Sequence, residues 1–149
     1  SHGDEVPLIH DLRKTYDYQP SLEVVAKHTE AEVIGYGLLT PVTIRGNRPT
    51  TTILALAPLA VAPDWQGKGV GSELLSELET RARLAGFSAI SVVGDMNFYG
   101  ARGYVMAEDF AIHNSLPIPM GSNLIKALTP GALANVGGRI EYPSAFHAN

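Results

Sequence analysis

Three glycines alternate along the run QGKGVG, at Gly67, Gly69 and Gly71, between an apolar segment (51–61) and an amphipathic one (72–86). The first amides of a helix have no partner within it, and the helix dipole adds roughly half a positive charge there. Glycines remove side-chain bulk, so a phosphate oxygen can approach those amides. The run therefore predicts an anion site suited to a pyrophosphate. The alternative is a glycine-rich turn that only allows close packing of a strand on a helix.

Two common phosphate loops do not fit this spacing. A Walker loop needs Gly-Lys-Ser/Thr at its end, whereas Lys68 comes too early and Gly71 is followed by Ser72. The dinucleotide pattern G-x-G-x-x-G fails because, counted from Gly67, its last glycine would fall on Ser72. The failure of both patterns argues against a nucleotide-binding protein, which is kept only as a third hypothesis behind the two given at the end of this section.

The chain offers few alternatives for covalent or metal chemistry. It has no cysteine, which excludes thiol catalysis and cysteine-based metal sites. His10, His28 and His113 are isolated and lack the spacing of paired metal ligands, so we expect no metal site.

The elements that must position the glycine run follow from the apolar pattern. The 149 residues, 45% of them apolar and 17% charged, predict one domain over 1–149. The expected elements are a helix over about 4–14, a strand hairpin over 22–28 and 33–44, a central strand over 51–61, a helix over 72–86 ending at a glycine cap, a strand over 88–94, then edge strands with a helical turn near Thr129 and Pro130. Residues 53–94 form a β-α-β unit in this scheme.

Two features disturb the expected strands. Gly35 and Gly37 weaken the hairpin and indicate a bulge or a close neighbour. Pro58 cannot donate a ladder hydrogen bond, so the central strand should be broken, bulged or splayed near residues 57–59.

Two motifs together resemble the GNAT acyltransferase superfamily. The segment LAVAPDWQGKGVGSELL resembles motif A, because Gln66–Gly71 matches Q/R-x-x-G-x-G/A, and NFYGARGYV resembles the N-x-x-Y-x-x-x-G-F element. The tail LTPGALANVGGRIEYPSAF resembles a bacterial subgroup of predicted N-acetyltransferases. The resemblance implies an α/β (α+β) fold that binds acyl-CoA, with a twisted, mixed and mostly antiparallel sheet, a splayed parallel strand pair and flanking helices. Such domains begin with a strand and a longer helix that this chain is expected to lack.

The resemblance also implies roles for individual residues. The backbone of the strand end would pair with the pantetheine arm of acetyl-CoA, and the loop with the first helical turn would bind its pyrophosphate. These two sets are Leu59, Ala60 and Val61, and Gln66, Gly67, Lys68, Gly69, Val70, Gly71 and Ser72.

Proton transfer needs two further groups. Tyr99 matches the tyrosine that protonates the departing thiolate, with an aromatic packing role as the alternative. An amine of pKa about 10.4 arrives protonated, so something must take its proton. Segment 51–61 has no carboxylate, which leaves Asp95 as the candidate base, while Asp64 is expected to cap or shape the loop.

The leading hypothesis is an acetyl-CoA-dependent N-acetyltransferase that acts on a primary amine of a small molecule or peptide by direct transfer in a ternary complex. The alternative is a non-catalytic acyl-CoA-binding sensor or regulatory module. A net charge of −4 argues against nucleic acid as a partner, and no apolar run reaches the roughly 18–20 residues that span a membrane. We expect a cytoplasmic protein and keep a homodimer among its possible partners.

Overall fold

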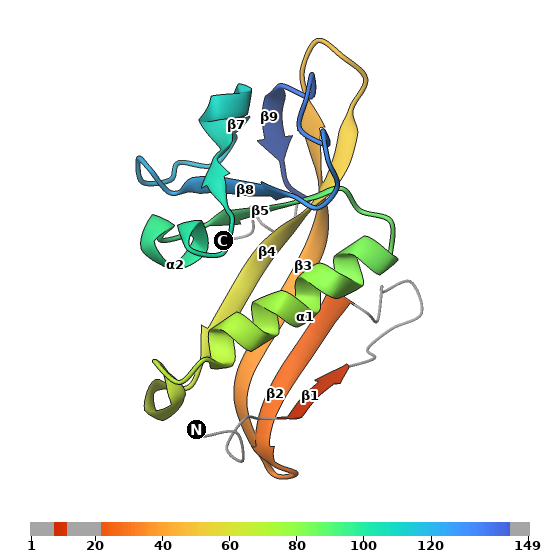
Figure 1. The fold of residues 1–149 in the computed structure, drawn as a ribbon. Coiled ribbons are helices and arrows are strands. Elements are labelled where there is room, and N and C mark those ends of the chain that lie inside the picture. The colour runs from red at the N-terminus through yellow and green to blue at the C-terminus, as the bar shows by residue number, and fades with distance from the viewer. Residues whose placement is uncertain (1–7, 12–21, 144–149) are drawn as a thin grey trace. The chain divides into compact units, whose positions relative to one another are not determined.

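The computed structural model describes residues 8–11 and 22–143, which form two compact units (Figure 1). The first unit contains the described residues up to 39 together with 56–86, and the second contains 40–55 together with 87–143. In chain order the elements are β1 (Leu8–Asp11), β2 (Glu23–Thr29), β3 (Glu32–Arg45), β4 (Thr51–Val61), the 3-10 turn η3 (Pro63–Trp65), α1 (Val70–Leu84), β5 (Ala89–Val93), α2 (Met96–Gly100), β6 (Val105–Met106), the 3-10 turn η4 (Ala107–Phe110), β7 (Ile112–Asn114), β8 (Asn123–Ala127) and β9 (Gly138–Glu141). Strands β3 and β4 contribute residues to both units.

The first unit is built on the strand order β1-β2-β3-β4, with antiparallel pairing of β1 to β2 and of β2 to β3. The hairpin predicted from the sequence is confirmed. The helix predicted over 4–14 is wrong at residues 8–11, because these pair with β2 from Leu8↔Lys27 to Asp11↔Val24. Pairing along β2 overrides a helical spacing that spans only a few residues. The remainder of that predicted helix lies outside the described residues.

Helix α1 packs on β2 and β3 of the first unit (Figure 1), and two glycines allow its close approach. A Cβ atom on Gly35 would lie 2.9 Å from Cδ1 of Leu74, and one on Gly37 would lie 2.6 Å from Cδ1 of Leu78. The close neighbour predicted for these glycines is therefore confirmed. The β2–β3 register also shifts beside Lys27, as expected of a bulge.

The predicted helix after the glycine run is confirmed, although it begins at Val70, two residues earlier than expected. Leu74 and Leu78 are completely buried on its inner face, whereas Leu84 is exposed at its end. Burial of each such side chain stabilises the packed helix by about 1.5–3 kcal/mol. The predicted glycine after the helix is Gly86, whose φ is 90°.

The second unit has the strand order β4-β5-β8-β6, and β9 pairs with β3 and β7. β8 lies antiparallel between β5 and β6, and β7 runs parallel to β9. β8 is therefore an interior strand, which corrects the expectation of edge strands alone after residue 105. The apolar pattern of β8 fits this place, because Leu124 and Ile125 are fully buried.

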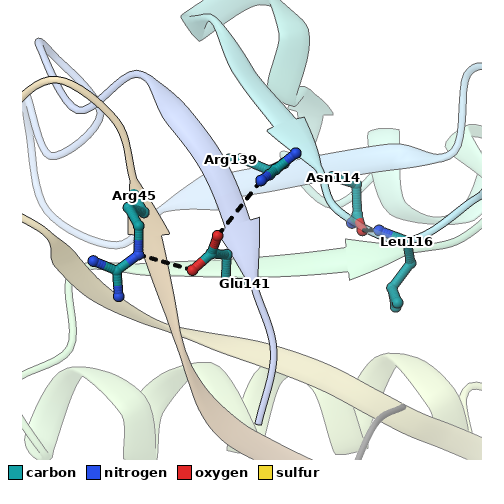
Figure 2. A network of polar contacts seen from close by, with 5 residues as sticks. All are labelled: Arg45, Asn114, Leu116, Arg139 and Glu141. Atoms are coloured by element: carbon teal, nitrogen blue, oxygen red, sulfur yellow. Dashed lines mark hydrogen bonds and ion pairs between the residues drawn. The ribbon is translucent and has the colours of Figure 1, made fainter. Parts of the chain in front are cut away.

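Charged side chains form ion pairs beside the ladder between β3 and β9 (Figure 2). The ladder places Arg45 directly opposite Arg139, and Glu141 contacts both, with 2.8 Å between Arg45 Nε and Glu141 Oε1 and 3.7 Å between Arg139 Nη2 and Glu141 Oε2. The hydrogen bond from Arg45 is the main reason that the pKa of Glu141 lies below its ordinary value. On neighbouring β7, Asn114 Oδ1 accepts a hydrogen bond of 2.9 Å from the Leu116 amide.

The predicted fold class is confirmed: a mixed α/β structure with parallel and antiparallel strands and two α-helices among the described residues. The segment after Thr129 forms successive turns and is not assigned as a helix, although Ala132 N donates to Thr129 O over 3.2 Å. No helix in the described part of the chain is long and apolar enough to cross a membrane.

Candidate functional site

The end of β4 changes from buried to exposed at the position of Pro58. Residues 53–56 are buried, whereas Ala57, Pro58 and Ala60 are exposed. Of the three alternatives predicted near Pro58, a break is wrong, because β4 continues to Val61 with a cis Ala57–Pro58 peptide bond. A bulge or a splay at these residues stays a prediction. The backbone of β4 stays extended to Val61, but the residues after Leu56 are no longer buried.

The loop after β4 is held by hydrogen bonds to β3, within itself and to the end of β4, all in the first unit. Ala62 N donates to Ile34 O over 2.7 Å, and Trp65 N donates to Ala62 O over 2.8 Å. Gln66 Nε2 donates to Val61 O over 3.0 Å, so the glutamine side chain fixes the loop against the strand. The cap predicted for Asp64 is not found, because Asp64 lies inside η3 and no side chain caps that turn.

The glycines of the loop adopt conformations that other residues avoid. The φ angles are 77° at Gly67 and 90° at Gly69, and a Cβ atom on either would meet no atom within 4 Å. An L-residue in this left-handed region costs about 1–2 kcal/mol. The glycines are therefore needed for the backbone path and not for close packing inside the protein, and the space in front of them is open.

The helix start leaves a group of amides available. Glu73 N makes the first hydrogen bond of the helix, to Gly69 O over 3.1 Å. Within the described part of the chain, the amides of residues 67–71 donate no backbone hydrogen bond. Lys68 is exposed beside them. Free N–H groups, a positive dipole end and an open approach together form an arrangement that can bind an anion.

A groove of ≈ 300 Å³ begins where β4 ends. It is lined by the start of β3 and the end of β4, at Val33, Ile34, Gly35, Tyr36, Ala60, Val61 and Ala62. Its lining is mostly aliphatic, and Tyr36 is its aromatic member. The groove and the amides of residues 67–71 both belong to the first unit. Val61, at the end of β4, lines the groove and also accepts the hydrogen bond from the Gln66 side chain.

The first unit also contains a buried acid that the sequence analysis did not select. Glu23 is 6% exposed, and Tyr36 Oη donates a short hydrogen bond to its Oε2 atom. Burial, together with the hydrogen bond and charge of Glu23, raises the pKa of Tyr36 to about 12. The sequence does contain a signal for this pair, since Glu23 interrupts the apolar run LEVVA and Tyr36 stands between two glycines.

In the second unit, Asp95 and Tyr99 lie at the two ends of one helical turn. Asp95 is the N-cap of α2, and its Oδ1 accepts a hydrogen bond of 3.0 Å from Asn97 N. The Tyr99 ring is packed edge-on against Phe98 and Tyr104, with ring centroids 4.9 and 5.4 Å away. Burial raises the pKa of Tyr99 above its ordinary value, so its phenol keeps its proton near neutral pH.

The structure groups the predicted residues in two sets. The expected cofactor-binding residues form one continuous path in the first unit, from Leu59 to Val61 on β4 and from Gln66 to Ser72 at the start of α1. Tyr99 and Asp95 form the other set, on α2 of the second unit. Among the described residues there is no group of three or more His, Cys, Asp or Glu that could hold a metal ion.

Comparison with known proteins gives one consistent result. Residues 3–104 match the model of the Acetyltransferase (GNAT) family. The chain is 30% identical over 143 residues to the uncharacterized N-acetyltransferase YhbS of Escherichia coli K12, which covers 96% of this chain and 83% of that protein. It is 32% identical over 116 residues to the uncharacterized N-acetyltransferase YjhQ of the same strain, covering 77% and 64%.

Two solved structures are similar over most of the chain. The structure of YhbS from Escherichia coli in complex with CoA has a TM-score of 0.78 and 28% identity, and the match covers 86% of this chain and 70% of that one. A GNAT family acetyltransferase from Brucella melitensis in complex with acetyl-CoA has a TM-score of 0.64 and 25% identity, with coverage of 85% and 68%.

Proposed function

Because the chain belongs to the Acetyltransferase (GNAT) family, we propose that it transfers the acetyl group of acetyl-CoA to a primary amine of a small molecule or peptide, by direct transfer in a ternary complex. The observation that carries the proposal is the row of free amides at residues 67–71, at the positive end of α1. The CoA and acetyl-CoA in the two similar structures support the choice of co-substrate.

The residues present fit the charge and shape of acetyl-CoA. The amides from Gly67 to Gly71 would bind the pyrophosphate, with Lys68 close enough in sequence to add a positive charge. The backbone from Leu59 to Val61 would bind the pantetheine arm, because β4 is uncovered there. Gln66 holds the loop on Val61 O, and Val70 and Ser72 complete the first turn. When bound, acetyl-CoA supplies an activated acetyl group as a thioester.

Tyr99 is proposed as the general acid. Its phenol would donate a proton to the sulfur as the thiol leaves, a contribution worth about 10²- to 10⁴-fold in rate. Two features support this role: the raised pKa keeps the proton on the phenol near neutral pH, and the two flanking aromatic rings fix the ring plane.

The proton of the acceptor amine needs a separate group. Asp95 is the proposal that follows from the sequence, and its carboxylate also caps α2. The variant Asp95→Asn keeps a capping oxygen, so a fall in turnover without loss of stability would support a role beyond capping. The single domain over 1–149, the homodimer and the cytoplasmic location stay predictions.

A non-catalytic acyl-CoA-binding module is the second candidate. One observation favours it: β4 has no titratable side chain along its whole length, from Thr51 to Val61. The two functions are separated by measuring acetyl-CoA affinity by calorimetry and, in parallel, thiol release and acetylated product across a panel of primary amines. Micromolar binding with amine-dependent product supports the enzyme, and equal binding without product on any amine supports the module.

A further inference from the structure

Glu23 is a buried acid to which the proposed reaction so far gives no role. One carboxylate oxygen, Oε2, accepts from Tyr36. The other, Oε1, is buried and has no hydrogen-bond partner among the described residues. A buried carboxylate oxygen without a donor is unfavourable, because it has lost its hydration and gained nothing in return. Such a group in a native fold often marks a place where a ligand or a proton is handled.

The face of the sheet that carries this pair is the one turned away from α1. Gly35 and Gly37 face Leu74 and Leu78 of the helix, so Tyr36, which lies between them, points to the opposite side. Glu23 lies in register with Leu38, and Val25 lies in register with Tyr36, which places Glu23 on the same side as the phenol.

The exposed end of β4 shares this face. Leu59 Cδ1 lies 3.3 Å from a Cβ position on Gly37, so Leu59 points toward the helix side. Ala60 therefore points to the other side, where it is exposed and lines the groove together with Tyr36. Tyr36 thus lines the same groove as the strand proposed to hold the pantetheine arm, and its hydroxyl donates to the Glu23 carboxylate.

The chemistry of the groove selects a class of acceptor. Its walls are aliphatic at Val33, Ile34, Ala60 and Val61, so they favour an apolar stem. A phenol oxygen backed by a carboxylate favours a cationic hydrogen-bond donor. Among the described residues that line the groove, Tyr36 is the titratable one.

We infer that Tyr36, with Glu23 behind it, receives the acceptor of the proposed reaction as a primary ammonium on an apolar stem and takes its proton. An N–H bond of the ammonium breaks as that proton moves to Tyr36 Oη, while the Tyr36 hydroxyl proton moves to Glu23 Oε2. The amine becomes neutral, Tyr36 stays neutral and Glu23 becomes a neutral acid that later returns its proton to water. Tyr36 is the catalytic residue and Glu23 acts through it. The inference rests on the proposed acetyl transfer and offers a second group for the proton assigned to Asp95.

The test compares two acceptors that differ in charge near neutral pH. 2-Phenylethylamine is protonated and must lose a proton, whereas aniline is already neutral. The variants are Glu23→Gln and Tyr36→Phe, with Asp95→Asn as the competing candidate and Glu32→Gln as the control, since Glu32 is an exposed carboxylate on β3 of the same unit. We expect Glu23→Gln and Tyr36→Phe to lose about 10²-fold in kcat/KM with 2-phenylethylamine and less than about 3-fold with aniline.

A binding measurement tests recognition of the ammonium group without relying on turnover. Calorimetry with the CoA-loaded protein compares 2-phenylethylammonium chloride with 2-phenylethanol, its uncharged analogue. Glu23→Gln should weaken binding of the ammonium by at least about 10-fold, because its charge partner is gone, and leave the alcohol unchanged. Glu23→Gln is nearly isosteric, and thermal melting reports whether it and Tyr36→Phe stay folded.

The outcomes separate the inference from the proposed function. If the unaltered protein does not bind acetyl-CoA, or turns over none of the amines, the proposed function is contradicted. Normal turnover with equal losses on both amines, or with an amine-selective loss only in Asp95→Asn, overturns the inference alone. Equal affinity of Glu23→Gln and unaltered protein for the ammonium also overturns it.

Discussion

Gly94 leaves the space that the Tyr99 ring fills: a Cβ atom on Gly94 would lie 2.8 Å from Cδ2 of Tyr99. Gly94 directly follows β5. Its amide donates to Ser122 O over 3.0 Å, and this hydrogen bond holds the Gly94 backbone in place. The position of the proposed general acid is therefore set by a glycine five residues earlier.

Gly94→Ala should displace the Tyr99 phenol. We expect kcat to fall by about 10²-fold, close to the loss expected for Tyr99→Phe, because both changes remove the acid from the thiol. The check is a double-mutant cycle in steady-state kinetics with acetyl-CoA. In the Tyr99→Phe background, Gly94→Ala should cost little more. Full and additive losses would show that Gly94 acts through something other than the phenol.

Gly69→Ala should reduce CoA affinity as well as stability. A non-glycine residue at φ 90° costs about 1–2 kcal/mol, and the added methyl group would stand in the open space in front of the free amides. We expect Kd for CoA to rise at least about 10-fold by calorimetry, equivalent to about 1.4 kcal/mol. Gly86→Ala is the matched control, since Gly86 has the same φ and equally open surroundings at the other end of α1. It should lose similar stability and bind CoA normally; equal loss of affinity in both would contradict the pyrophosphate site.

Gly37→Ala tests the contact between α1 and the sheet. The new Cβ atom would lie 2.6 Å from Leu78 Cδ1, and overpacking of this kind costs about 1–3 kcal/mol of unfolding free energy. Urea denaturation measures the loss. Combined with Leu78→Ala, which removes the clashing methyl group, the loss should be smaller than the sum of the single losses. Strict additivity would mean that the sheet, and not Leu78, absorbs the added atom.

The Tyr36–Glu23 contact predicts a loss of stability at alkaline pH. The pKa of Tyr36 rises from 10.0 to about 12 on folding, so the unfolded chain releases this proton first as the pH increases. The contribution is complete below pH 10 and is lost between about pH 10 and 12. Unfolding free energies of the unaltered protein should fall more steeply across this window than those of Tyr36→Phe. Parallel curves for the two proteins would contradict the contact.

The sequence was sufficient where a pattern was long or was fixed by backbone geometry. The helix after the glycine run was predicted within two residues, because Leu74 and Leu78 repeat at helical spacing and Gly86 ends it. The free amides followed from alternate glycines at a helix start. The predicted helix over 4–14 failed at residues 8–11 because strand pairing with a distant segment decided the conformation.

The sequence marks Glu23 and Tyr36 individually as unusual, but their contact could not be predicted, since it depends on the register between two strands. A break at Pro58, one of the three alternatives expected there, is also not found. Proline removes a donor without ending an extended backbone, so β4 could continue to Val61. The role of Asp95 as a helix cap likewise became visible only when α2 was seen to start beside it.

Acetyl transfer itself is measured by incubating the protein with acetyl-CoA and 2-phenylethylamine and following both products, free CoA thiol and the acetylated amine, by absorbance and mass spectrometry. We predict that they form in equal amounts, that Tyr99→Phe slows both by about 10²- to 10⁴-fold, and that Gly69→Ala raises the acetyl-CoA concentration needed. Tight acetyl-CoA binding with no acetylated product from this or any other primary amine would contradict this prediction.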